Sequence, residues 1–290
     1  MHPDDDPYRP LAPSPPQPKK RGGALGGALV ALGLLAVKFK ALLSALFAFK
    51  WLILAPKLLL SFGSVFVSLW FYALLFGWKF AIVFVALIFV HEMGHYVTFR
   101  NFGMPVSLPM FIPGLGAFVS TPMSTDPARN AIGAIMGPVF GVAASTICWA
   151  YGAATQPAVS LDHNFWIAAA YVGFFINLFN LIPAYPLDGG RIAGAIDGRL
   201  WLLGAVLIVA WLGYDVVRLG HIPSAFTVLI LGFVLFSSLP RAIAAFRGRI
   251  DPRERIGSCA QRAILAISYF GLLAICAAGA AATQHVPPAT

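Results

Sequence analysis

Long apolar runs separated by short polar segments dominate the chain from residue 58 onward. Residues 58–78 and 80–90, for example, hold no charged side chain. A helix needs about 20 apolar residues to cross the hydrocarbon core of a bilayer. The pattern therefore predicts an all-α polytopic membrane protein with six to seven transmembrane helices. The candidate spans lie at about 58–78, 79–99, 131–154, 164–184, 200–217, 222–241 and 262–282.

The segments outside these spans divide the chain into parts. Residues 1–23 are polar and rich in proline, which predicts a disordered cytoplasmic tail. Residues 24–57 are apolar but interrupted by lysines, so we expect interfacial or short membrane helices there. Residues 58–241 form the predicted membrane core. A basic cytoplasmic loop and a final span are expected within 242–290.

The overall composition supports lipid as the main solvent of this chain. Hydrophobic residues make up 59% of it and charged residues only 11%, whereas soluble domains carry about a quarter charged residues. A net charge of +9 raises the possibility of nucleic-acid binding, but the basic residues lie at the ends of apolar segments and in short loops. That placement is typical of topology signals and headgroup contacts. We therefore expect the lipid bilayer, and no nucleic acid, as a partner.

The basic residues also predict an orientation. With the amino terminus in the cytoplasm, alternating the seven spans places all but two of the 20 Lys and Arg residues on the cytoplasmic side. The exceptions are Lys79 and Arg218. This distribution is the one that the positive-inside rule requires. The sequence thus predicts a multi-pass protein of the cell membrane.

A metal-binding pattern stands inside the second span, as His91-Glu92-Met93-Gly94-His95. Side chains four positions apart lie on one face of a helix, about 40° apart in projection, so both imidazoles can bind one zinc ion. Glu92 stands next to the first imidazole, where it can accept a proton from an attacking water. Ionisable groups at membrane depth are expensive and tend to mark function. Buried polar residues that bridge helices are the alternative.

A third zinc ligand is expected from the end of the fourth span. Pro183 and Pro186 break the helix there, and Asp188 follows, directly before Gly189 and Gly190. The two glycines let the backbone approach another element closely. In the orientation above, the His91–His95 pair and Asp188 lie toward the same, cytoplasmic side. An ordinary turn aspartate is the alternative.

Together these motifs resemble a known family. His91-Glu92-x-x-His95, followed by Asn180-x-x-Pro183-x-x-x-Leu187-Asp188-Gly189, is similar to the paired signature of the site-2 proteases, which are intramembrane zinc metalloproteases. The resemblance covers roughly residues 60–200. It implies that His91, His95 and Asp188 bind Zn²⁺, that Glu92 is the general base, and that residues 58–241 are an intramembrane protease core. It further implies membrane-anchored protein substrates that are cut within a transmembrane segment.

Two further features bear on substrate binding. Asn180 can donate hydrogen bonds to the substrate or to the developing oxyanion, or it can bridge two helices. Residues 103–120 are apolar but too rich in Pro and Gly for a helix. Non-helical backbone at membrane depth must be covered by protein or line a cavity. We expect a short membrane-associated β-hairpin beside the active site, to which an extended substrate can add as a strand; a simple re-entrant connection is the alternative.

Two other functions compete with proteolysis. A membrane transporter of metals or ions can use the same His/His/Asp site, because ionisable groups often line transport routes. Against it, transport does not require Glu92, and the hydropathy pattern shows no inverted repeat. An inactive, protease-like scaffold is the other alternative. The predicted function is zinc-dependent hydrolysis of peptide bonds at the edge of, or within, the bilayer.

Overall fold

The computed structural model describes residues 23–154, 161–219, 224–249 and 251–284. The chain divides into two compact units, Met1–Pro56 and Lys57–Thr290. In the first unit the described backbone is helical and belongs to α1 (Gly23–Phe76). Apart from Gly23, the predicted disordered tail lies outside the described residues. Residues 24–57 fall in this single helix and not in separate helices, and their placement on or in the membrane stays a prediction.

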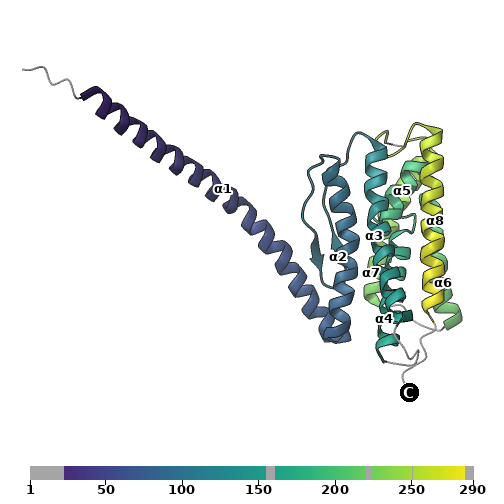
Figure 1. Cartoon of the computed structure of the whole chain (residues 1–290). Helices are drawn as coiled ribbons and strands as arrows, with labels where there is room; N and C mark the ends of the chain where they lie inside the picture. The colour runs from purple at the N-terminus through teal and green to yellow at the C-terminus, as the bar shows by residue number, and fades with distance from the viewer. Residues whose placement is uncertain (1–22, 155–160, 220–223, 250, 285–290) are drawn as a thin grey trace, which may run out of the picture. The chain divides into compact units, whose positions relative to one another are not determined.

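The second unit contains the end of α1 and all other elements (Figure 1). Every predicted span corresponds to a helix. Within the described residues, five helical segments are long and apolar enough to cross a membrane, whereas Asn164–Asn180 and Leu200–Tyr214 are shorter apolar segments. The predicted number of six to seven spans therefore stays a prediction. The helices of this unit after α1 are α2 (Trp78–Asn101), α3 (Pro127–Ala154), α4 (Leu161–Asn180), α5 (Asp188–Asp197), α6 (Leu200–Leu219), α7 (Ala225–Phe246) and α8 (Cys259–Thr283).

Helix α5 was not among the predicted elements. Asp188 is its first residue, whereas the sequence suggested only a Gly-Gly pair that lets the backbone approach another element closely. Only ten residues long, α5 has too few apolar residues in a row to look like a span. Its buried face is made mainly of small residues, with Ile192 as the one large apolar side chain among them. A helix of this kind is stabilised by its neighbours and less by its own sequence.

The predicted β-hairpin is present as a two-stranded antiparallel sheet. Strand β1 (Met110–Ile112) pairs with β2 (Gly116–Phe118), and Phe111 lies opposite Ala117. Gly114 and Gly116 have positive φ angles of 81° and 100°. Only glycine adopts such angles without strain, so these two residues permit the tight connection between the strands.

Small residues let α2 and α3 approach closely. A Cβ atom added to Gly94 would lie 2.3 Å from the carbonyl oxygen of Met136, and one added to Gly133 would overlap the ring of Phe99. Close contact of this kind is typical of helix pairs in membranes, where there is no hydrophobic drive for helices to leave lipid. The resulting core between α2, α3, α4 and α8 is rich in Ala and Gly.

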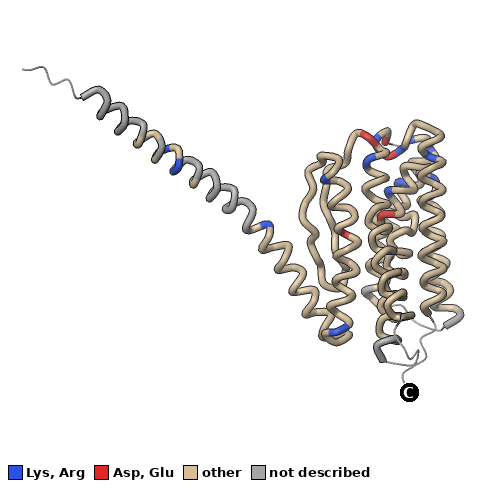
Figure 2. The backbone as a smooth tube through the Cα atoms, viewed as in Figure 1, with Lys and Arg blue, Asp and Glu red and all other residues tan. Residues whose placement is uncertain are grey.

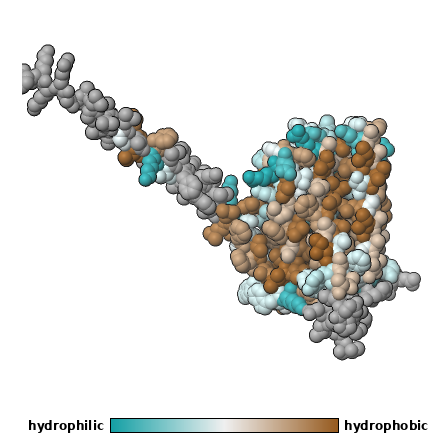
Figure 3. Space-filling model, in the orientation of Figure 1, coloured by the Kyte–Doolittle hydropathy of each residue, from teal (hydrophilic) through white to brown (hydrophobic). Residues whose placement is uncertain are grey.

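The surface is apolar where a bilayer would cover it. On the face of the second unit shown in Figure 3, a broad band of hydrophobic residues separates more polar ends. Figure 2 shows most Lys and Arg residues of α2–α8 and their loops toward the end of the bundle that holds α5. Charge is therefore concentrated on one side of the apolar band, as the sequence predicted.

Substitution of Gly94 tests the close approach of α2 and α3. Gly94→Ala places a methyl group against the α3 backbone, which cannot move aside as a flexible side chain would. We expect a loss of about 1–3 kcal/mol in the free energy of unfolding, measured by denaturation in detergent micelles. Gly232→Ala on α7 is the control, because nothing lies within 4 Å of its added methyl group. Equal free energies of unfolding in the two variants would show that α2 and α3 do not approach closely at Gly94.

Candidate metal centre

Two histidines on consecutive turns of α2 form the first half of the site. His91 and His95 are 3% and 7% exposed, respectively. Their Nε2 atoms lie 3.2 Å apart. The rings are close to perpendicular, at 79°, with centroids separated by 4.9 Å. The i, i+4 spacing thus brings one nitrogen of each ring to a common point inside the protein.

Asp188 reaches the same point from the start of α5. Its Oδ2 atom lies 3.1 Å from Nε2 of His91 and 3.2 Å from Nε2 of His95. The Gly189-Gly190 pair makes this placement possible. A Cβ atom on Gly189 would lie 2.2 Å from the carbonyl oxygen of Leu181, and one on Gly190 would lie 2.6 Å from the backbone of Ala184. Larger residues would push α5, and Asp188 with it, away from the histidines.

Hydrogen bonds at the far side of each ring fix which nitrogen faces the shared point. Nδ1 of His95 donates to the carbonyl oxygen of Gly133 at 2.8 Å. Nδ1 of His91 lies 2.8 Å from Oδ1 of Asn177, whose Nδ2 donates to the carbonyl oxygen of Gly173 at 2.7 Å. Because the amide nitrogen of Asn177 is used on Gly173, its oxygen accepts from His91. In the neutral rings, both Nε2 atoms therefore carry the lone pair.

Glycines on α3 make room for these two side chains. An added Cβ on Gly137 would lie 2.2 Å from the His95 ring, and one on Gly141 would lie 2.2 Å from Oδ1 of Asn177. Gly133, Gly137 and Gly141 are spaced four residues apart, so they share one face of α3. These three glycines thus let α3 lie close to the His95 ring and the Asn177 amide.

This donor set suits a small divalent cation. Two imidazole nitrogens and a carboxylate oxygen converge with separations of 3.1–3.2 Å. Ligand atoms bound at about 2.0 Å in a tetrahedron are separated by about 3.3 Å. The two fixed tautomers present two nitrogen lone pairs to one point, and Asp188 adds a carboxylate oxygen, as metal ligation requires. These three residues could hold a metal ion and leave a fourth position for another group.

Glu92 lies beside these ligands. It is 6% exposed, and one ligand atom each from His91, Glu92 and His95 all lie within 4.8 Å of one another. The predicted site residues His91, Glu92, His95 and Asp188 are thus brought together, although 93 residues separate His95 from Asp188.

A cavity of about 620 Å³ opens onto the four residues. Its walls include β2, the turn before it, part of α4 and part of α7. Asn180, the fifth predicted site residue, lines this cavity at the end of α4. The β-hairpin therefore lies beside the candidate metal centre.

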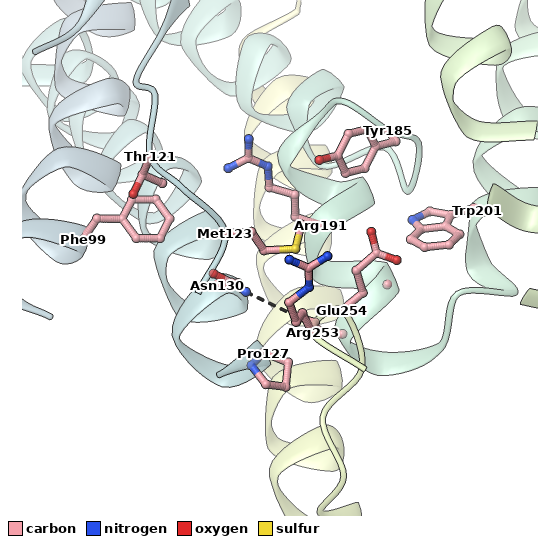
Figure 4. Close-up of a pocket in the computed structure, with 12 residues that line it drawn as sticks. Phe99, Thr121, Met123, Pro127, Asn130, Tyr185, Arg191, Trp201, Arg253 and Glu254 are labelled. Atoms are coloured by element: carbon pink, nitrogen blue, oxygen red, sulfur yellow. Dashed lines mark hydrogen bonds between the residues drawn. The ribbon is translucent and has the colours of Figure 1, made fainter. Parts of the chain in front are cut away.

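A smaller cavity of about 120 Å³ adjoins the first, and Figure 4 shows its lining. Phe99, Thr121 and Arg191 line both cavities. Arg253 and Glu254, from the loop between α7 and α8, line the smaller one. Asn130 Nδ2 donates a hydrogen bond of 3.3 Å to the carbonyl oxygen of Arg253. The basic loop thus packs against the start of α3, next to the candidate metal centre.

Comparison with known proteins agrees with this geometry. Residues 79–163 and 153–200 match a family model described as peptidase family M50. This range contains both histidines, Glu92, Asn177 and Asp188. Over this stretch, the chain is similar to the site-2 proteases that this model describes.

Two individual relatives each match about 40% of the chain. A Mycobacterium tuberculosis protein named zinc metalloprotease Rip3 is 32% identical over 123 residues, which are 40% of this chain and 30% of the relative. A chloroplastic protein of Oryza sativa subsp. indica, named zinc metalloprotease EGY2, is 28% identical over 158 residues, or 41% of this chain and 29% of the relative. The chain thus spans about a third of the length of the curated relatives it matches.

The structure gives a role to one residue that was not among the predicted site residues. Asn180 was predicted as a site residue, yet it is Asn177 that orients His91. Two features of the sequence could have pointed to Asn177. It is a polar amide within an apolar span, and Gly141, in another span, leaves space for it. Neither observation identifies its partner without the packing of α2 against α4.

Asn177→Leu tests the orienting hydrogen bond. The His91 ring would lose the acceptor that fixes its tautomer, so we expect metal affinity to fall about 10- to 100-fold. Asn177→Asp keeps an acceptor oxygen and should bind metal more tightly than Asn177→Leu. Affinity can be measured by competition with a chromogenic chelator, with Asn101→Leu at the exposed end of α2 as a control. Wild-type affinity in Asn177→Leu would rule out the orienting role.

Proposed function

We propose that this chain is a zinc-dependent intramembrane endopeptidase that hydrolyses peptide bonds of membrane-anchored proteins. The observation that carries the proposal is the convergence of His91, His95 and Asp188 on one point, with the buried carboxylate of Glu92 beside it. The match to the peptidase family M50 model and the names of the two relatives support it. A purely structural polar cluster would not require Glu92 at this place.

The proposed role of each residue follows from its position in the site. His91, His95 and Asp188 would hold the zinc ion. When bound there, zinc supplies Lewis acidity that polarises a peptide carbonyl and acidifies a water molecule. Glu92 accepts the proton of the attacking water as the new carbon–oxygen bond forms. It then passes that proton to the leaving amine as the carbon–nitrogen bond breaks, so that the products are a carboxylic acid and an amine.

Asn180 is proposed to support the substrate. It lines the cavity at the end of α4, whereas the amide of Asn177 is already used by His91 and Gly173. A side-chain amide in this position can donate to the substrate backbone or to the developing oxyanion, and comparable donors contribute about 2.7–4 kcal/mol to transition-state stabilisation.

The proposed setting is the cell membrane, with the active site toward the cytoplasmic side and six to seven spans in all. His91 and His95 lie in the second half of α2, and Arg100 is in its final turn. Most other basic residues of the bundle lie toward the end that holds α5 (Figure 2). The positive-inside rule assigns that end to the cytoplasm. Water would then have a short route from the cytoplasm to the cavity.

Strand β2 offers the substrate a backbone to pair with. Phe111 directs its N–H away from β2, toward Ser64 on α1. Its partner Ala117 must then direct its own N–H and C=O away from β1, because the two groups of a residue point to the same side of a strand. By alternation Val119 does the same. Both residues line the cavity, so an unwound substrate can add to β2 beside the metal centre.

Glu92→Gln separates proteolysis from metal transport. The variant keeps the shape of the side chain and all three proposed ligands, so zinc content should be unchanged. Cleavage of a membrane-anchored test substrate should fall by about 10²- to 10⁴-fold, because the proton acceptor is lost. Glu254→Gln, in the only other glutamate of the chain, is the control and should cleave normally.

The measurement is cleavage in proteoliposomes, beside zinc content by atomic emission. Wild-type cleavage by Glu92→Gln would contradict the general-base role. Zinc uptake into the vesicles without any cleavage by the wild type would favour a transporter. Zinc binding with neither cleavage nor uptake would favour an inactive scaffold.

A further inference from the structure

The two outer edges of the β-hairpin differ in what they offer to a pairing strand. On β1 the outward-directed residues are Phe111 and, by alternation, Pro109 and Pro113. Proline has no N–H to donate, so this edge holds a single donor, that of Phe111. On β2 the outward-directed residues are Ala117 and Val119, and both have an N–H. By sequence alone, the β1 edge therefore offers a pairing strand fewer N–H donors than the β2 edge does.

Side chains of α1 form hydrogen bonds with the β1 edge. The Ser61 hydroxyl donates to the carbonyl oxygen of Pro109 at 2.6 Å, and the Ser64 hydroxyl accepts from the Phe111 N–H at 3.0 Å. Farther along the helix, the Tyr72 hydroxyl accepts from the Gly114 N–H at 3.1 Å. We call Ser61, Ser64 and Tyr72 the α1 ladder. The single donor of the β1 edge is taken up by this ladder.

The geometry of a helix and a strand explains why three contacts are possible. From Ser61 to Tyr72 the helix rises about 16 Å, and from Pro109 to Gly114 an extended chain also covers about 16 Å. The ladder residues lie within about 80° of one another around the helix axis. Helix α1 and strand β1 can therefore run side by side in the same direction with matched lengths.

Ser68 lies on the same face, between Ser64 and Tyr72. It is fully buried, and its hydroxyl has no hydrogen-bond partner among the described residues. On the face of α1 that meets the hairpin, Ser64 thus bonds the hairpin and Ser68 does not. Ser64 and Ser68 give a matched comparison within one helix.

We propose that the α1 ladder is a set of positioning residues that fixes the hairpin by its β1 edge and leaves the β2 edge alone open for the substrate. The inference rests on the proposed function, since it assigns a role in substrate binding. If β1 came loose, the hairpin could turn about its long axis, and Ala117 and Val119 would no longer face the metal centre. Ser61 and Ser64 do not line the cavity, although Tyr72 does. The ladder's hydrogen bonds go to the hairpin and not to the candidate ligands, so its effect should fall on substrate binding.

The test compares Ser64→Ala with Ser68→Ala in the full-length protein. Ser64→Ala leaves the Phe111 N–H without its acceptor, so amide exchange at Phe111 should become roughly five- to tenfold faster. KM for a membrane-anchored substrate should rise by a similar factor, with kcat changed less and zinc content unchanged. Ser64→Thr, which keeps the hydroxyl, should restore both values. Ser68→Ala should match the wild type in exchange and in KM.

A second variant tests the ladder independently, in case Ser64→Ala simply impairs folding. Tyr72→Phe removes one hydroxyl and keeps the packed ring, and it should speed exchange at Gly114 and raise KM in the same way. Ser268→Ala removes a hydroxyl that bonds only within α8 and serves as a remote control.

Exchange and cleavage together separate the two proposals. Equal exchange at Phe111 in Ser64→Ala and Ser68→Ala would overturn the ladder, whatever the enzyme does. Faster exchange with an unchanged KM would overturn its role in positioning substrate. If the wild type cleaves nothing, the proposed function fails and the positioning role fails with it, while exchange still reports whether α1 holds β1.

Discussion

Three electron-pair donors face one another within 3.2 Å in the interior of this protein: Nε2 of His91, Nε2 of His95 and Oδ2 of Asp188. In water, solvent would screen their repulsion. In a buried site at membrane depth there is little such screening, so this arrangement requires a cation or a proton among the three atoms. The Nδ1 atoms of the two rings donate hydrogen bonds to Asn177 and Gly133, so a change of tautomer cannot relieve this repulsion. The site is therefore built for a bound positive charge.

Much of the surrounding fold can be understood as a way to hold these groups in place. Gly137 and Gly141 give the His95 ring and the Asn177 amide the space that larger residues would fill, while Gly189 and Gly190 let α5 begin against the turn after α4. On the other side of the cavity, α1 takes up the β1 edge and leaves β2 free. Small residues bring helices together, and a few polar side chains fix the geometry, because lipid gives helices no hydrophobic reason to associate.

The helices and the candidate ligands could be predicted from the sequence for identifiable reasons. Long apolar runs have few alternatives to membrane helices, and the spacing of His91 and His95 fixes their relation on any helix. The hairpin was predictable because Pro and Gly between residues 103 and 120 exclude a helix at membrane depth. Asp188 could be named only by its motif and its expected depth in the membrane.

Features that depend on contacts between distant elements could not be predicted. Helix α5 is short and made mostly of small residues, so its sequence carries little helical signal of its own. The bond from His91 to Asn177 depends on how α2 packs against α4. The α1 ladder looked like two serines and a tyrosine in an apolar span, because the hairpin residues that they bond lie more than 40 residues away.

Zinc content of purified wild type and Asp188→Ala is the most direct test of the central claim that segments so far apart in sequence form one metal centre. The account predicts about one zinc ion per chain in the wild type. It predicts loss of that ion in Asp188→Ala, and a normal content in Asp197→Ala at the other end of α5. Wild-type zinc affinity in Asp188→Ala would show that Asp188 does not bind the metal and would contradict the account.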